Sequence, residues 1–126
     1  MNDELGMARR KQDLDFGCPI EVTLDVIGGK WKGMVLHRLL EGTARFNELR
    51  RIIPGITQRV LTLQLRELER DGVICRTVFP EVPPRVEYRL TEFGQSLAPI
   101  LGMMEKWGEQ YRDLVRPRGG SSGGIE

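Results

Sequence analysis

Residues 46–70 read FNELRRIIPGITQRVLTLQLRELER, and this stretch decides the fold because it predicts two short helices joined by a Pro-Gly turn. In the first half, Phe46, Leu49 and Ile53 share one helical face. Pro54 ends this helix, since proline disfavours a helical conformation in the residue before it. The second half starts a new helix directly after the turn, so the stretch predicts a helix-turn-helix motif.

The second helix of the motif is amphipathic. Thr57 is expected to cap it, because a threonine side chain can accept a hydrogen bond from a free backbone N–H of the first turn. Leu61, Leu65 and Leu68 follow at spacings of four and three and form the stripe that faces a core. At about 100° per residue, the opposite side carries cationic and apolar residues, with Thr62 at its edge. These outward residues are Arg59, Leu63, Arg66 and Arg70. Such a face can enter the major groove of DNA.

Composition agrees with this interpretation. A chain of 126 residues with 40% hydrophobic content predicts a single domain. The net charge is only +1, yet nine arginines stand against six acidic residues between Ala44 and Leu90, while the segments before and after each carry −1. Positive charge therefore gathers around the predicted helix pair. Lys30 and Lys32 stand outside it, at a predicted helix start, where they can contact phosphate or remain solvated.

Several classes of protein and site are not indicated. No apolar run approaches the roughly 20 residues of a membrane span, and the N-terminus is polar where a signal peptide would be apolar. We therefore expect a cytoplasmic protein without a membrane partner. Cys18 and Cys75 are too few for a disulfide framework and lack the paired spacing of a zinc site. The sequence predicts no metal, no cofactor and no catalytic residues, since it has neither a nucleophile-base arrangement nor a phosphate-cradling glycine loop.

Before the helix pair and at the chain ends, breakers and composition define the segments. Short helices are expected over 20–27 and 31–40, each ended by glycine. Residues 1–15 have mixed charge without periodicity, and 116–126 are rich in glycine and serine, so both ends are expected to be flexible. Residues 16–115 then form the predicted domain.

After the helix pair, the sequence predicts a β-hairpin and one long helix. Strands are expected over 73–79 and 86–90, with a stiff, proline-rich tip over 80–84. From Thr91 onward, apolar residues recur at helical spacing, and Pro99 is expected to kink this helix. Its apolar surface exceeds what one small domain can cover, which predicts a homodimer interface. The predicted interface residues are Leu97, Leu101, Met104, Trp107, Tyr111 and Leu114.

Helices, a helix-turn-helix and then a hairpin is the order of elements in a winged helix. The predicted fold class is α+β, mainly α: a winged helix-turn-helix with a two-stranded wing and a long C-terminal dimerisation helix. In this fold the second helix of the pair reads the major groove, and the wing lies along the backbone or the minor groove. Arg85, beside the stiff tip, is expected to reach the minor groove. The predicted contacts with double-stranded DNA are Arg45, Thr57, Gln58, Arg59, Thr62, Leu63, Arg66 and Arg85.

Five motifs, in order along the chain, also resemble a known family. They are Cys18-Pro19, Asp25-Val26-Ile27-Gly28-Gly29-Lys30-Trp31, Arg45-Phe46-Asn47-Glu48-Leu49, Leu65-Arg66-Glu67-Leu68-Glu69 and Pro80-Glu81-Val82-Pro83-Pro84-Arg85-Val86-Glu87-Tyr88. Together they resemble the HxlR-type regulators, relatives of MarR, from Cys18 to about Arg112. The resemblance implies a dimeric, cytoplasmic transcription regulator that binds an inverted repeat. In some members the cysteine of the Cys-Pro pair is a thiol switch, which implies a sensing role for Cys18, whereas Cys75 matches no motif of the family.

Two interpretations of Cys18 stay open. Proline is favoured at the first position of a helix, so Pro19 places Cys18 at the N-cap, where free N–H groups and the helix dipole stabilise a thiolate. The segment from Cys18 to Leu24 is then expected to lie near the dimer contact. Alternatively, Cys18 is a small buried hydrophobe, and a small apolar molecule bound between the C-terminal helix and the domain is the effector.

A winged-helix module that binds another protein is a further alternative. Its hallmark would be an apolar or acidic recognition face. The arginines at positions 59, 66 and 70 argue against it.

Overall fold

The structure is a computed structural model and describes residues 17–116. The flexible ends predicted over 1–15 and 116–126 lie, except for Arg116, outside the described residues. The chain divides between Gln95 and Ser96 into two compact units, which are described separately. The single domain expected over 16–115 stays a prediction.

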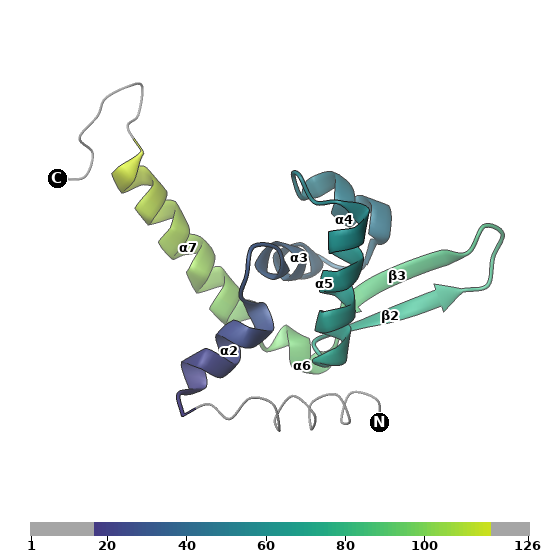
Figure 1. The fold of residues 1–126 in the computed structure, drawn as a ribbon, viewed down its shortest axis with the longest axis horizontal. Coiled ribbons are helices and arrows are strands. Elements are labelled where there is room, and N and C mark those ends of the chain that lie inside the picture. Colours follow the sequence, from purple (N-terminus) through teal and green to yellow (C-terminus); the bar gives the residue numbers. More distant parts are fainter. Residues whose placement is uncertain (1–16, 117–126) are drawn as a thin grey trace. The chain divides into compact units, whose positions relative to one another are not determined.

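The first unit contains the predicted helices, the helix-turn-helix and the hairpin (Figure 1). Its helices are α2 (Pro19–Ile27), α3 (Lys32–Leu39), α4 (Phe46–Ile52), α5 (Gln58–Arg70) and the short α6 (Glu92–Gln95). Its strands are β1 (Ala44–Arg45), β2 (Ile74–Phe79) and β3 (Arg85–Leu90). The second unit contains α7 (Ala98–Val115). The fold class predicted from the sequence, a mainly helical winged helix-turn-helix with a long C-terminal helix, is confirmed.

The helix pair forms where the sequence predicts it. Helix α4 ends at Ile52, and the turn that follows uses Gly55 with a φ of 83°, a conformation that side chains other than glycine rarely adopt. Thr57 caps α5, since its Oγ1 accepts a hydrogen bond from the backbone N–H of Val60 at 3.1 Å. The predicted stripe of α5 is buried, with exposed fractions of 0, 2 and 0% for Leu61, Leu65 and Leu68. One face of α5 is thus fixed in the core, which leaves the other for solvent.

The sheet differs from the prediction in having three antiparallel strands in the order β1-β3-β2. The wing is the β2-β3 hairpin, with Arg76 opposite Tyr88 and Cys75 opposite Arg89. The additional strand β1 pairs Ala44 with Tyr88. The two-stranded prediction missed it because a strand of two residues is too short to show an alternating pattern.

A hydrogen-bonded junction joins the base of the wing to α6. Thr91 Oγ1 donates to the carbonyl oxygen of Gly72 at 2.7 Å and accepts from the backbone N–H of Gly94 at 2.9 Å. Gly94 lies so close to β2 that a Cβ atom there would overlap the carbonyl oxygen of Val73. Only glycine fits this close approach without a shift of the backbone.

The long helix predicted from Thr91 onward, with a kink at Pro99, is wrong in its continuity. Helix α6 ends at Gln95, and a separate helix, α7, begins at Ala98 with Pro99 in its first turn. Proline is tolerated there because the first-turn N–H groups have no acceptor within the helix. Pro99 therefore starts α7 and does not bend it. Within residues 17–116, no helix combines the length and the apolar character that crossing a membrane requires.

Candidate nucleic-acid interface

The outward face of α5 forms a shallow, mixed surface. Gln58, Arg59 and Arg66 are exposed, and Leu63 has half of its side chain exposed between them. Together with Val60 and Thr62 they line one hollow along the helix. Thr62 Oγ1 donates a hydrogen bond to the carbonyl oxygen of Gln58 at 2.9 Å, so its methyl group and the two lone pairs of its oxygen are what it can offer to a ligand. The structure thus brings the predicted reading residues of α5 onto one surface.

Helix α5 is also held by a charged contact on its other side. Lys32 Nζ lies 2.7 Å from Glu67 Oε1, and the Lys32 side chain is only 11% exposed. Lys32 is therefore neither a solvated residue nor a free phosphate contact. Lys30, in contrast, is exposed and lies over the ring of Trp31, 4.7 Å from the ring centroid.

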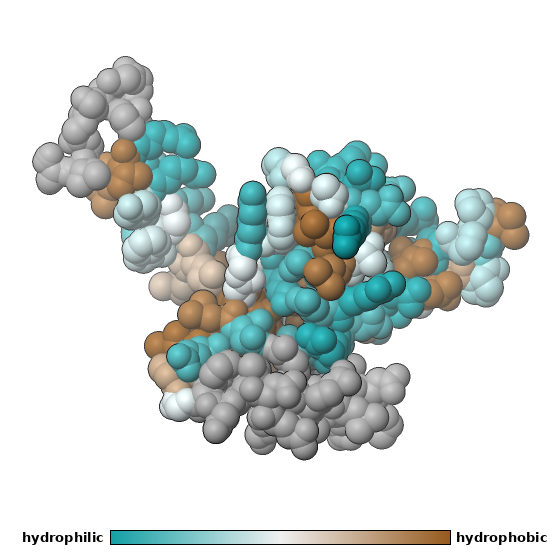
Figure 2. Space-filling model, viewed as in Figure 1, coloured by the Kyte–Doolittle hydropathy of each residue, from teal (hydrophilic) through white to brown (hydrophobic). Residues whose placement is uncertain are grey.

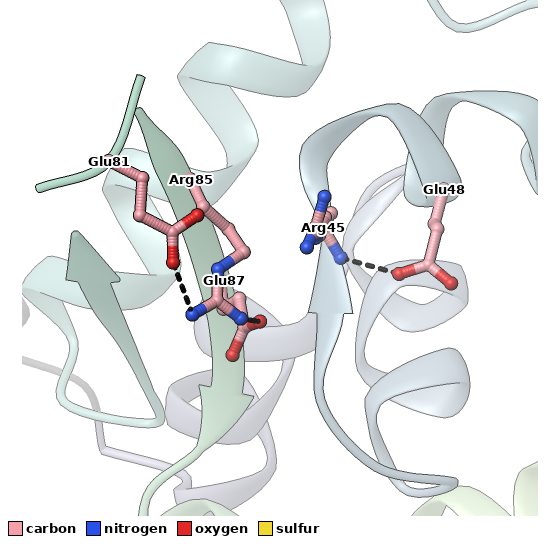
Figure 3. A network of polar contacts seen from close by, with 5 residues as sticks. All are labelled: Arg45, Glu48, Glu81, Arg85 and Glu87. Atoms are coloured by element: carbon pink, nitrogen blue, oxygen red, sulfur yellow. Dashed lines mark hydrogen bonds and ion pairs between the residues drawn. The ribbon is translucent and has the colours of Figure 1, made fainter. Parts of the chain in front are cut away.

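A second predicted contact, Arg45, lies where β1 meets α4 (Figure 3). Its backbone N–H donates to Glu48 Oε1 at 2.7 Å, while its residue surface is exposed. A groove of about 760 Å³ lies between the start of α4 and the tip of the wing. Its lining includes Arg45, Asn47, Arg51, Pro84 and Arg85. Three arginines, from β1, α4 and β3, thus line one groove.

Arg85 is held within the wing by two carboxylates (Figure 3). Its Nη1 donates to Glu87 Oε2 and its Nη2 donates to Glu81 Oε2, each at 2.9 Å. Its guanidinium also lies 3.9 Å from the centroid of the Phe79 ring. A minor-groove contact by Arg85 would have to use the other N–H groups of its guanidinium or replace one of these partners. This network was not predicted from the sequence, although Glu81 and Glu87, four positions before and two positions after Arg85, were a signal for it.

The tip of the wing carries an exposed apolar side chain. Val82 is fully exposed, and Figure 2 shows a hydrophobic group at the end of the hairpin beside weakly hydrophilic residues. The peptide bond between Val82 and Pro83 is cis.

Helix α7 exposes an apolar stripe. Residues at spacings of four, three, four and three from Ile100 have exposed fractions between 41 and 65%. They are Ile100, Met104, Trp107, Tyr111 and Leu114. The rings of Trp107 and Tyr111 stack, with centroids 5.3 Å apart and planes 8° from parallel. This set, called the α7 stripe below, contains four of the six predicted interface residues and adds Ile100.

The other two predicted interface residues differ from the stripe. Leu101 is buried, with only 4% exposed, and Leu97 is partly buried. Leu101 stays a prediction as an interface residue. The sequence pattern groups it with the others because it lies four residues after Leu97 and three before Met104, a helical spacing.

Cys18 is exposed at the N-cap of α2, as the Cys-Pro pair predicts. The alternative that it is a buried hydrophobe is therefore wrong. On the same helix, Ile20 and Leu24 have 67 and 55% of their surfaces exposed. Cys75 lies in β2 and is partly buried. Among residues 17–116, no three His, Cys, Asp or Glu side chains gather in a way that could hold a metal ion.

Comparisons with known proteins agree with this geometry. The sequence model of the HxlR-like helix-turn-helix family matches residues 26–116. The chain is 58% identical over 114 residues to the uncharacterised HTH-type transcriptional regulator YdeP of Bacillus subtilis, covering 90% of this chain and 88% of YdeP.

Solved structures give the same result. The redox regulator HypR in its oxidised form is 62% identical, with a TM-score of 0.73 over 76% of this chain and 99% of that chain. The reduced form of the regulator YodB from B. subtilis is 37% identical, with a TM-score of 0.66 over 76% of this chain and 95% of that chain. The chain belongs to the HxlR-like helix-turn-helix family of transcriptional regulators.

Proposed function

We propose that this protein binds DNA sequence-specifically as a homodimer on an inverted repeat and regulates transcription there. The observation that carries the proposal is the outward face of α5, where Arg59, Leu63 and Arg66 are exposed on a helix whose opposite face is fixed in the core. Arginine can donate two hydrogen bonds to guanine, and an apolar side chain can contact the methyl group of thymine. This combination of groups suits a base-reading helix better than a protein-binding surface.

The α7 stripe supports the dimer. Its large aromatic and methionine side chains are of the kind that anchor protein interfaces, and stacking fixes two of them relative to each other. A two-fold dimer would present two copies of α5 about 34 Å apart, one turn of DNA. The operator is therefore expected to be an inverted repeat with half-sites at that spacing.

We further propose that oxidants or electrophiles regulate the protein through Cys18. The redox regulator HypR is a close relative, and Cys18 is exposed at the start of α2. An exposed thiol can react with an oxidant or electrophile, whereas a buried thiol is protected.

Selection of binding sites from a random DNA pool by the purified full-length protein tests the proposal. The expected result is an enriched inverted repeat with half-sites about ten base pairs apart. Enrichment of no sequence, or of a single half-site only, would contradict it.

A further inference from the structure

A second hollow, of about 300 Å³, lies between α5 and the base of the wing. Its lining comprises Thr62, Leu65, Arg66, Glu69, Arg76 and Tyr88. Thr62 and Arg66 also line the hollow on the reading face, so the two surfaces are continuous. We call this second hollow the helix-wing notch. Neither Arg76 nor Tyr88 was among the contacts predicted from the sequence.

The chemistry of the notch suits an anion. Arg76 and Tyr88 are directly opposite each other on β2 and β3, so their side chains leave the same face of the sheet, toward Arg66 on α5. Two guanidinium groups against one carboxylate, that of Glu69, give the lining a net positive charge. Arginine is well suited to phosphate because its planar fork can donate two parallel hydrogen bonds.

Tyr88 adds a neutral donor. It is only 8% exposed, and burial raises the pKa of its hydroxyl, an effect that Arg76 partly offsets through its charge and a side-chain hydrogen bond. The hydroxyl therefore keeps its proton at physiological pH and can donate it to an oxyanion.

The path of DNA over a winged helix brings a phosphate to this place. When the reading helix occupies the major groove and the wing occupies the neighbouring minor groove, one sugar-phosphate strand separates the two grooves. That strand must cross the space between helix and wing. In this protein the space is the helix-wing notch.

We propose that the helix-wing notch binds one backbone phosphate of the operator, with Arg66, Arg76 and Tyr88 as its donors. This inference rests on the proposed DNA-binding function and adds to it a defined phosphate site. Because a phosphate contact carries no sequence information directly, the notch sets the position of α5 on the duplex and does not read bases.

A salt titration of operator binding tests the inference. Arg76→Gln is expected to lower the slope of log affinity against log salt by about 0.9, the contribution of one phosphate contact, and to weaken binding to all sequences alike. Arg89→Gln is the matched control, since Arg89 is an exposed arginine on the adjoining strand but on the opposite face of the sheet. Equal slopes for the two variants would overturn the proposal. Thermal unfolding of each variant checks that the wing is intact.

A chemical change in the DNA locates the phosphate. Operators with a single uncharged methylphosphonate linkage, moved stepwise along the half-site, should weaken the parent protein most strongly at one position. At that position Arg76→Gln should lose little further affinity, whereas at other positions the two losses should add. If each linkage weakened the parent and Arg76→Gln equally, Arg76 would contribute only long-range electrostatic attraction to DNA. That result would overturn the phosphate site.

Glu69 and Tyr88 provide independent checks. Glu69→Gln removes the opposing charge and is expected to strengthen binding, and Tyr88→Phe keeps the buried ring but is expected to weaken binding by removing one donor. Unchanged affinity in both variants would contradict the proposal that the helix-wing notch binds a phosphate. Failure of the proposed function has a different signature, because the parent protein would then enrich no sequence from random DNA and lack a steep salt dependence.

Discussion

Arg59 and Thr62 lie next to each other on the outward face of α5, but they offer different groups to DNA. The Arg59 guanidinium is exposed, whereas the Thr62 hydroxyl already donates to Gln58. We expect Arg59→Ala to reduce discrimination at one base pair by about 1–3 kcal/mol. Thr62→Val keeps the side-chain shape and should change sequence preference less. Site selection with each variant measures this, and an unchanged selected sequence for Arg59→Ala would remove Arg59 from the base contacts.

The structure alters the expected DNA contact of Arg85 most, because two carboxylates already bind its guanidinium. Arg85→Ala is expected to weaken operator binding and to lower its salt dependence, since a cation is lost from the wing. Glu81→Gln separates this role from a purely structural one, because it removes one of the two carboxylates that hold the guanidinium.

If Arg85 releases Glu81 to contact DNA, Glu81→Gln should strengthen binding. Weaker binding would show instead that the network keeps the wing in shape. A fluorescence titration at two salt concentrations distinguishes the two outcomes.

Gly94 limits the stability of the wing base. We expect Gly94→Ala to lower the free energy of unfolding by about 1–3 kcal/mol, the usual cost of overpacking, because the added methyl group meets the backbone of Val73, just before β2. Gly102→Ala in α7 is the control, since nothing lies within 4 Å of its Cβ position and alanine favours a helix. Urea unfolding of both variants tests this. Equal free energies of unfolding for the two variants would show that the backbone near Gly94 shifts to accommodate the methyl group at little cost.

Among the elements, α5 was predictable and the sheet was only partly so. The spacing of Leu61, Leu65 and Leu68 predicts directly which side of α5 is buried. The Pro-Gly pair marks the turn after which α5 begins. Strand β1 has only two residues and depends on pairing with a strand more than 40 positions away, which no local pattern encodes.

Proline explains another difference. Proline can kink a helix or begin one. The sequence pattern alone therefore could not show whether Pro99 lies inside one long helix or begins a separate helix, α7. The pairing of Arg85 likewise depends on how residues are arranged in three dimensions, which periodicity does not report.

The α7 stripe carries the prediction for the dimer. Trp107→Glu places a charge among the exposed apolar residues, so the dissociation constant of the dimer should rise about 30-fold or more, the ~2 kcal/mol of an interface hot spot. Glu109→Lys, on the opposite side of α7, is the control and should leave association unchanged. Sedimentation at micromolar concentration measures both. A Trp107→Glu protein that associates like the parent would place the interface elsewhere.

The proposed regulation requires that a chemical change at one site alters the spacing of the two reading helices in the proposed dimer. Cys18 stands at the start of α2, and the exposed Ile20 and Leu24 of that helix suit a contact with a second subunit. An adduct or an intersubunit disulfide at Cys18 would then shift how the two subunits pack, and the DNA contacts of both α5 helices would change together.

The cysteine variants provide the test of this last prediction. Oxidant or electrophile should change operator binding by the parent and by Cys75→Ser, but not by Cys18→Ser, because only Cys18 is both exposed and at a helix N-terminus. Mass spectrometry of the treated parent should find the modification on Cys18. A Cys18→Ser protein with the full response of the parent would exclude the switch at Cys18. A response lost in Cys75→Ser alone would assign sensing to the wing, where β2 carries that thiol beside the helix-wing notch residue Arg76.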